Sequence, residues 1–143
     1  MPFKKLSEQE YTALLKFPAY ISLLAANWDD ELNENEKKVA IKLSHTKTFS
    51  CDPLLTEFYK ESDKVFKKNI EQLDNDLPKG KKSRETAIKK ELLKLDKIVS
   101  KLGKEYASTM HNSMESFKYH VSKAHYNVLM NFNLSLSTKG LTE

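Results

Sequence analysis

The most regular hydrophobic pattern in the chain lies in residues 104–132, with the sequence KEYASTMHNSMESFKYHVSKAHYNVLMNF. Apolar side chains recur there at alternating spacings of four and three residues, at Met110, Met114, Phe117, Val121, Ala124 and Val128. This spacing places them on one face of an α-helix. The pattern therefore predicts a last helix roughly 43 Å long, and residues 134–143 form a tail with only a weak helical pattern.

Other segments repeat this helical spacing, and none has the alternation of a β-hairpin. A stripe over residues 88–102 ends at Gly103, a residue typical of helix ends, and follows a loop at residues 77–82. The 143 residues include only three glycines and four prolines, which argues against a turn-rich sandwich or barrel. We therefore expect a single all-α domain over residues 1–143, a compact bundle of six or seven helices with a long C-terminal helix.

Local signals predict where several helices begin. Ser7 and Glu10 have the spacing of a capping box, in which each side chain bonds the backbone N–H of the other residue. Asn33 and Glu36 repeat that spacing. Asp52 directly precedes a proline, which is typical of an N-cap followed by proline in the first helical turn.

The first half of the chain contains one segment that is apolar nearly all round. Such a segment, residues 17–28, predicts a central, buried helix. The next helix is expected to turn Val39, Ala40 and Leu43 inward and to fray near residues 46–48. Residues 55–77 form either one helix or two, because polar residues interrupt the apolar stripe.

The number of cysteines and the length of the apolar runs indicate the cellular compartment. The single cysteine, Cys51, cannot form a disulfide within the chain or a cysteine-rich zinc site, which fits a reducing compartment. The apolar run of residues 17–28 is shorter than the roughly 20 residues that span a bilayer. An amphipathic pattern with Glu8, Glu10 and Lys16 precedes it, unlike a signal peptide. We therefore expect a cytoplasmic protein.

Charge is distributed unevenly along the chain, whose net charge is +4. Residues 1–36 carry a net charge of −4, and residues 79–104 carry +7. The basic segment places one group of lysines opposite its apolar stripe, with further cations nearby: Lys90, Lys94, Lys97, Lys101 and Lys104, then Lys79, Lys81, Lys82 and Arg84. Lysines on the side of a helix opposite its apolar stripe ordinarily only face the solvent.

The alternative function for this basic segment is a lysine-rich helical module that binds anionic membrane or nucleic acid. Nucleic acid is the less favoured partner, because Arg84 is the only arginine in the chain and no aromatic residue lies among the lysines.

An acidic turn at residues 27–36 is the strongest candidate for a binding site. Calcium and similar hard cations take six to eight oxygen ligands, which carboxylates and amides on one turn can supply. The candidate ligands are Asp29, Asp30, Glu31, Asn33 and Glu36. The other interpretation is that these acids stabilise a helix N-terminus through the helix dipole.

The turn matches the second half of an EF-hand loop in part. Asp29 takes the fifth position, Leu32 the apolar eighth and Glu36 the bidentate twelfth. Two positions disagree, because Ala25 in the first position has no side-chain oxygen and Asp30 replaces the turn glycine. In addition, the preceding helix has to end before its apolar run does.

Histidine and cysteine give weaker candidates. His111 and Glu115 are one helical turn apart and can share a metal ion or form a salt bridge. A thiol nucleophile at Cys51 with His45 as its base is the enzymatic alternative. No phosphate-binding glycine loop accompanies it, and the sequence offers no oxyanion site. We therefore expect no catalytic residues and a protein that is not an enzyme.

Several stretches together suggest a family. Residues 6–11, LSEQEY, precede a small apolar helix that ends in two alanines at residues 25–26. Residues 29–36, DDELNENE, and a lysine-rich helix follow. Residues 113–129, and above all VSKAH at residues 121–125, form a later helix. This order resembles the tellurite-resistance TerB-like family, whose hallmark is Ala-Asp-Gly-x-Ile-x-x-x-Glu between two helices.

The resemblance implies an all-helical bundle of about seven helices and a cytoplasmic, non-enzymatic protein linked to tellurite and other chemical stress. It also implies a protein partner, in a membrane-proximal complex, and a divalent cation such as calcium at the acidic turn. Asp29, Leu32 and Glu36 match the motif aspartate, apolar residue and closing glutamate, whereas Asp30 stands in place of its glycine. A second acidic turn of the family has at most a remnant at residues 139–143.

Overall fold

The computed structural model describes residues 2–26 and 34–140, with side chains described for residues 3–26 and 34–124. The elements in chain order are η1 (Pro2–Lys5), α1 (Glu8–Leu14), α2 (Phe17–Ala25), α3 (Glu34–Ser50), η2 (Pro53–Leu55), α4 (Thr56–Asp76), α5 (Lys81–Ser100) and α6 (Lys104–Gly140). Every regular element in these ranges is a helix, which confirms the predicted all-α class. The total number of helices and the length of the last one stay predictions. Among the described helices, none is both long enough and apolar enough to cross a membrane.

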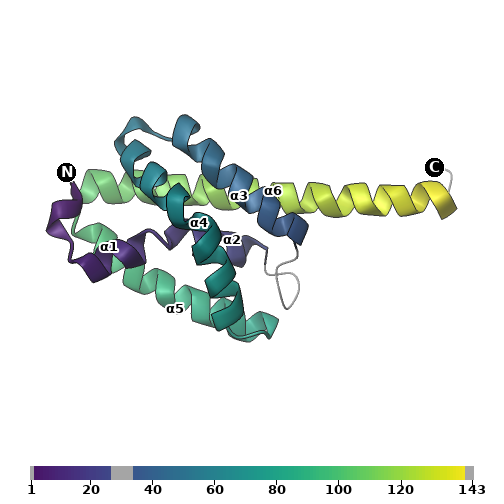
Figure 1. Ribbon diagram of the computed structural model, residues 1–143, viewed down its shortest axis with the longest axis horizontal. Helices are drawn as coiled ribbons and strands as arrows, with labels where there is room; N and C mark the ends of the chain where they lie inside the picture. The colour runs from purple at the N-terminus through teal and green to yellow at the C-terminus, as the bar shows by residue number, and fades with distance from the viewer. Residues whose placement is uncertain (1, 27–33, 141–143) are drawn as a thin grey trace.

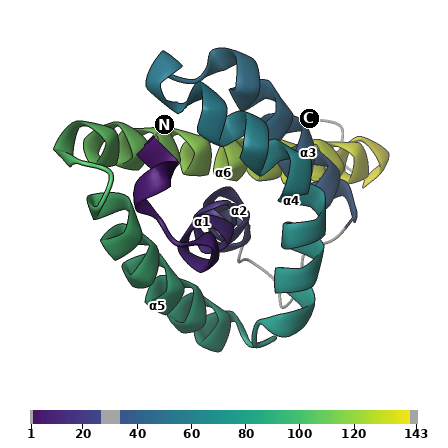
Figure 2. The same cartoon turned by 60° about the vertical axis from the view of Figure 1, so that its left-hand side comes forward.

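Helix α2 lies at the centre of the bundle. Eight of its nine residues are buried, as the apolar pattern predicted. It contacts α4, α5 and α6, which lie on three sides of it (Figure 2). Helix α3 packs against α4 and crosses α6 (Figure 1). Helix α5 lies at one edge of the bundle, and its outer side is turned away from the other helices (Figure 2).

Two of the predicted helix starts are confirmed. The Ser7 hydroxyl accepts from Glu10 N at 3.1 Å, and Glu10 Oε1 accepts from Ser7 N at 2.9 Å, which completes the capping box before α1. Asp52 Oδ1 accepts from Leu54 N at 2.9 Å where η2 begins. The predicted helix end at Gly103 also fits, because this glycine has a φ of 99°, where other residues are strained.

Helix α3 is longer than predicted. It does not fray at residues 46–48 but continues to Ser50. Its buried residues share one face that is mostly not hydrophobic: Glu36, Ala40 and Ser44. The expected inward residues Val39 and Leu43 are only half-buried. The apolar pattern indicated Ala40 but not Ser44, whose burial is possible because its hydroxyl donates to a carboxylate of α4.

Helix α4 is one continuous helix, which decides between the two alternatives for residues 55–77. The polar interruption is tolerated because its side chains have partners. The buried Ser62 hydroxyl donates to Leu15 O at 3.2 Å, and Asp63 accepts a bond from Ser44 at 3.2 Å.

The core between α4 and α6 gives a stability prediction. Phe66 and Phe117 meet edge to face with ring centroids 6.4 Å apart, and both are almost fully buried. Phe117→Ala is expected to lower the free energy of unfolding by about 3–5 kcal/mol, because it leaves a cavity. Urea denaturation followed by circular dichroism measures this loss. Phe49→Ala is the matched control, since Phe49 is 80% exposed, and a loss as large as that of Phe117→Ala would contradict the packing.

Candidate functional site

Most predicted cation ligands lie outside the described residues, namely Asp29, Asp30, Glu31 and Asn33. Glu36 is described: it is the third residue of α3, and it is buried, with 9% of its surface exposed. The structure therefore shows one of the predicted ligands and the two helix ends that flank the turn.

Those helix ends fit a loop between two helices. Helix α2 ends at Ala25 with Ala26 as its C-cap, and both residues are buried. Helix α3 begins at Glu34. The apolar run of residues 17–28 favoured a longer α2, so its earlier end removes one of the three objections to a cation-binding loop.

Charged side chains hold the first turn of α3 against the corner between α4 and α5. Lys37 Nζ lies 3.7 Å from Glu34 Oε1 and 3.8 Å from Asp74 Oδ2. Arg84 Nη1 donates to Asp74 Oδ1 at 2.7 Å, and its Nη2 donates to the backbone oxygen of Asp74 at 2.7 Å. The carboxylate of Asp74 thus joins three helices at one point.

The structure contradicts the grouping of Arg84 with the lysines that could contact phosphates. Its side chain is only 2% exposed, and Arg84 Nε donates to Pro78 O at 2.9 Å. The planar guanidinium suits this role, since it donates several bonds in fixed directions. Lys79 Nζ also donates to Asp74 O, at 2.9 Å. Sequence reasoning missed this cluster, and the only local signal was a lone arginine among many lysines.

This cluster predicts the effect of one substitution. Asp74→Ala leaves the buried guanidinium of Arg84 without its carboxylate and is expected to lower the free energy of unfolding by about 3–5 kcal/mol. Urea denaturation measures the change. Adding Arg84→Met to Asp74→Ala should recover part of the loss, because the unpaired charge is gone. Asp76→Ala, at an exposed position in the last turn of α4, is the control, and an equal loss there would contradict the role of the cluster.

The predicted lysine face on α5 is exposed and partly neutralised. Two of its lysines form ion pairs, Lys94 with Glu91 at 3.2 Å and Lys101 with Glu10, and the neighbouring Lys89 pairs with Glu85 at 3.2 Å. Within the described ranges, Lys90, Lys97 and Lys104 have no carboxylate at ion-pair distance. Leu93 lies between Lys90 and Lys97 on α5 and is 65% exposed, whereas Lys104 is the first residue of α6.

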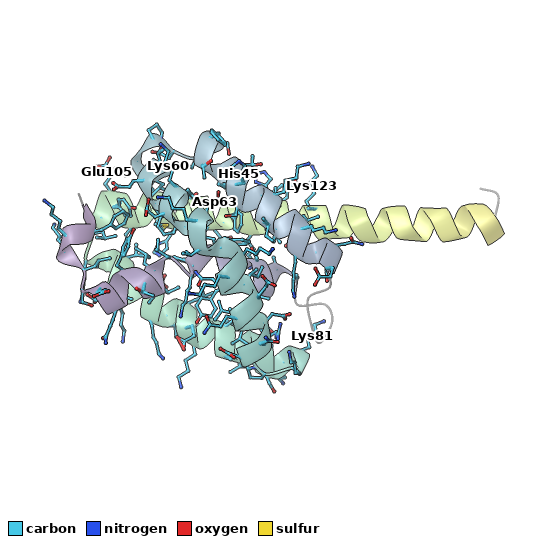
Figure 3. The ribbon with its side chains drawn as sticks, viewed as in Figure 1. His45, Lys60, Asp63, Lys81, Glu105 and Lys123 are labelled. Carbon is cyan, nitrogen blue, oxygen red and sulfur yellow. The ribbon has the colours of Figure 1, made fainter. Side chains whose placement is uncertain are left out.

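The histidine and cysteine candidates are placed apart. His45 Nδ1 lies 2.9 Å from Asp63 Oδ2, so α3 and α4 meet through this pair (Figure 3). Ser44 donates to the same carboxylate. Cys51 Sγ lies 3.9 Å from Thr56 Oγ1. The imidazole of His45 is therefore paired with Asp63 and not with the Cys51 thiol.

His111 pairs with a residue that the sequence did not indicate. Its Nε2 lies 3.0 Å from Asp96 Oδ1, across the contact between α5 and α6. Asp96 and His111 line a cavity of about 200 Å³, and Glu115 lines it too. In residues 3–26 and 34–124, where side chains are described, no three histidine, cysteine or acidic side chains are arranged to hold a metal ion.

Comparison with known proteins found no matching family model, no matching curated protein and no matching solved structure. The TerB-like resemblance therefore stays a prediction from the residues that suggested it.

Proposed function

We propose that the chain is a non-enzymatic, cytoplasmic, TerB-like protein that acts as a scaffold in stress response or protein interaction. Its partner is a protein, in a membrane-proximal complex. It binds a divalent cation, calcium or similar, weakly at Asp29, Asp30, Glu31, Asn33 and Glu36. The proposed bundle has six or seven helices and a long C-terminal helix. The all-α class of the described residues supports this proposal.

The position of the two helix ends carries the proposal for the cation. A calcium-binding loop joins two helices, and its terminal bidentate glutamate lies where the second helix begins. In the proposed register, Ala25 in the first position is the last residue of α2, and Glu36 in the twelfth lies in the first turn of α3. The described helix ends thus agree with the register that the acidic residues suggested.

The same register explains why binding is expected to be weak. Ala25 supplies no side-chain oxygen at the first position, and Asp30 replaces the glycine that allows the sharp turn. Calcium loops lose affinity as ligand charge and rigidity fall, to dissociation constants of about 10⁻⁴–10⁻³ M. We therefore propose a site that is occupied only at high cation concentration.

Calcium is expected to change the fluorescence of Trp28, the only tryptophan of the chain, which directly precedes Asp29. Glu36→Gln should weaken binding by about tenfold or more, because it removes a charge from the terminal ligand. A fluorescence titration, repeated by calorimetry, measures both affinities.

Glu34→Gln is the matched control for this titration. Glu34 lies in the same helical turn as Glu36, its side chain is 82% exposed, and the register gives it no ligand role. Circular dichroism shows whether both variants keep their helices. No fluorescence change and no heat at about 10 mM calcium would remove the cation from the proposal.

The outer side of α5 supports a second candidate function, binding to an anionic membrane. Two lysines without carboxylate partners, Lys90 and Lys97, lie one helical turn on either side of the exposed Leu93, and a third, Lys104, begins α6 just after α5 ends. Lysines near an anionic bilayer are attracted to its surface, and an apolar side chain among them can enter the interface. A nucleic acid has no apolar layer that Leu93 could enter, and this face has no aromatic side chain on which bases could stack.

Reversing three charges tests this candidate. The triple variant Lys90→Glu, Lys97→Glu, Lys104→Glu is expected to weaken sedimentation with phosphatidylserine–phosphatidylcholine vesicles by about a hundredfold, at about 1 kcal/mol per lysine. Binding by the unaltered chain should also fall as salt rises, because salt screens the attraction.

A second triple variant on α4 has the same change in net charge. It replaces Lys60, Lys67 and Lys68, which are exposed, with glutamate. Equal losses in both variants would contradict a specific surface on α5. Stronger retention on duplex DNA than on vesicles would assign the lysines to nucleic acid.

A further inference from the structure

A polar pocket of about 300 Å³ lies where the last turn of α3 and the start of η2 meet α6. Lys47 and Asp52 line one side. A stripe on α6 with helical spacing lines the other: Thr109, Asn112, Ser113 and Ser116. The neighbouring face of α6 is buried in the core through Met110 and Phe117. Helix α6 therefore turns its apolar side to the core and a hydrogen-bonding side to this pocket.

Lys47 supplies the positive charge of the pocket. It is half-buried, and its Nζ donates to Ser116 Oγ at 3.3 Å. Burial holds the pKa of Lys47 below its usual value, because water is partly excluded from its ammonium group. Within the described part of the chain, no carboxylate forms an ion pair with it. An anion in the pocket would therefore offset a desolvation cost that the protein itself leaves uncompensated.

Two serines of α6, Ser113 and Ser116, line the pocket with hydroxyl groups. Tyr59 is fully buried, and its hydroxyl lies 2.6 Å from Ser113 Oγ. Burial raises the pKa of Tyr59, so the phenol stays protonated, and either hydroxyl of this pair can donate to the other. When Tyr59 is the donor, the proton of the Ser113 hydroxyl is left to donate to a ligand. The Ser116 hydroxyl accepts from Lys47 Nζ, so its own proton is also left to donate to a ligand.

We propose that this pocket binds the phosphate group of a small, soluble phosphomonoester, held by Lys47, Ser113 and Ser116. A phosphate presents three strong acceptor oxygens, which match one ammonium and two hydroxyl donors. The volume exceeds that of a phosphate alone, so a few carbon atoms of the ester fit beside it. The pocket lies at the opposite end of α3 from the proposed cation site and does not depend on it.

The remaining polar groups indicate what the organic part carries. Asp52 Oδ1 already accepts from Leu54 N, and its carboxylate repels a second anion. It can accept from hydroxyl groups, as can the amide oxygen of Asn112, which also donates. The inferred ligand is therefore a phosphorylated polyol, with its phosphate toward Lys47 and its hydroxyls toward Asp52 and Asn112.

Titration with glycerol 3-phosphate, followed by calorimetry and by amide shifts of the α6 stripe, tests the proposal. Lys47→Gln is expected to weaken binding at least about tenfold, because it removes a charged donor. Ser116→Ala should weaken it about threefold to tenfold. Lys42→Gln, at an exposed position on the same helix, should leave binding unchanged. Glycerol, which lacks the phosphate, should not bind.

Three outcomes would overturn the proposal. The first is that the unaltered chain does not bind glycerol 3-phosphate at about 10 mM, a concentration that should occupy a specific site of this kind. The second is equal binding by Lys47→Gln, with circular dichroism showing that the variant is folded. The third is binding only to vesicles containing phosphatidic acid, lost in Lys47→Gln, which would assign the phosphate to a lipid headgroup. Should Lys47→Gln not fold, Ser116→Ala and the amide shifts of the unaltered chain decide.

Discussion

Burial of α2 on nearly all sides is the constraint on which the arrangement of the other helices depends. A nine-residue helix with eight buried residues needs cover from several directions, and α4, α5 and α6 supply it. Even its polar residue is compatible with this position. The hydroxyl of Ser22, which is fully buried, donates to Pro18 O at 2.9 Å, so this hydroxyl does not oppose burial. Helix α1 is too short to replace any of these neighbours, and it instead packs against α5.

Hydrophobic burial of α2 leaves the ends of the surrounding helices to be fixed by polar contacts. The Arg84–Asp74 pair does this at the corner between α4 and α5, and Lys37 extends the contact to α3. A buried charge pair adds little stability over an apolar substitute, but breaking it is costly, so the pair disfavours other packings of this corner. Because Lys37 directly follows Glu36, the same contact also fixes where the acidic turn ends.

Hydrophobic spacing and capping signals predicted the helices that bury a regular apolar stripe. Ile88, Leu95 and Val99 on α5 are buried as expected, and the Ser7 capping box is formed. The same reasoning failed where a helix packs through polar residues. Ser44 can be buried because Asp63, nineteen residues further along the chain, accepts a hydrogen bond from its hydroxyl. A partner that far away leaves no mark on local periodicity, and the burial of Arg84 escaped prediction for the same reason.

The length of α3 shows how one such error reaches the functional interpretation. A helix that frays at residues 46–48 leaves Lys47 on an exposed turn, where a lysine has no particular meaning. Because α3 continues to Ser50, Lys47 faces α6 and contacts Ser116. Hydrophobic spacing detects the apolar stripe of α6 that includes Met110 and Met114, and it gives no signal for the polar residues beside that stripe. Only the packing of α3 against α6 brings the lysine and the hydroxyls together, so this pocket could not be predicted from either helix alone.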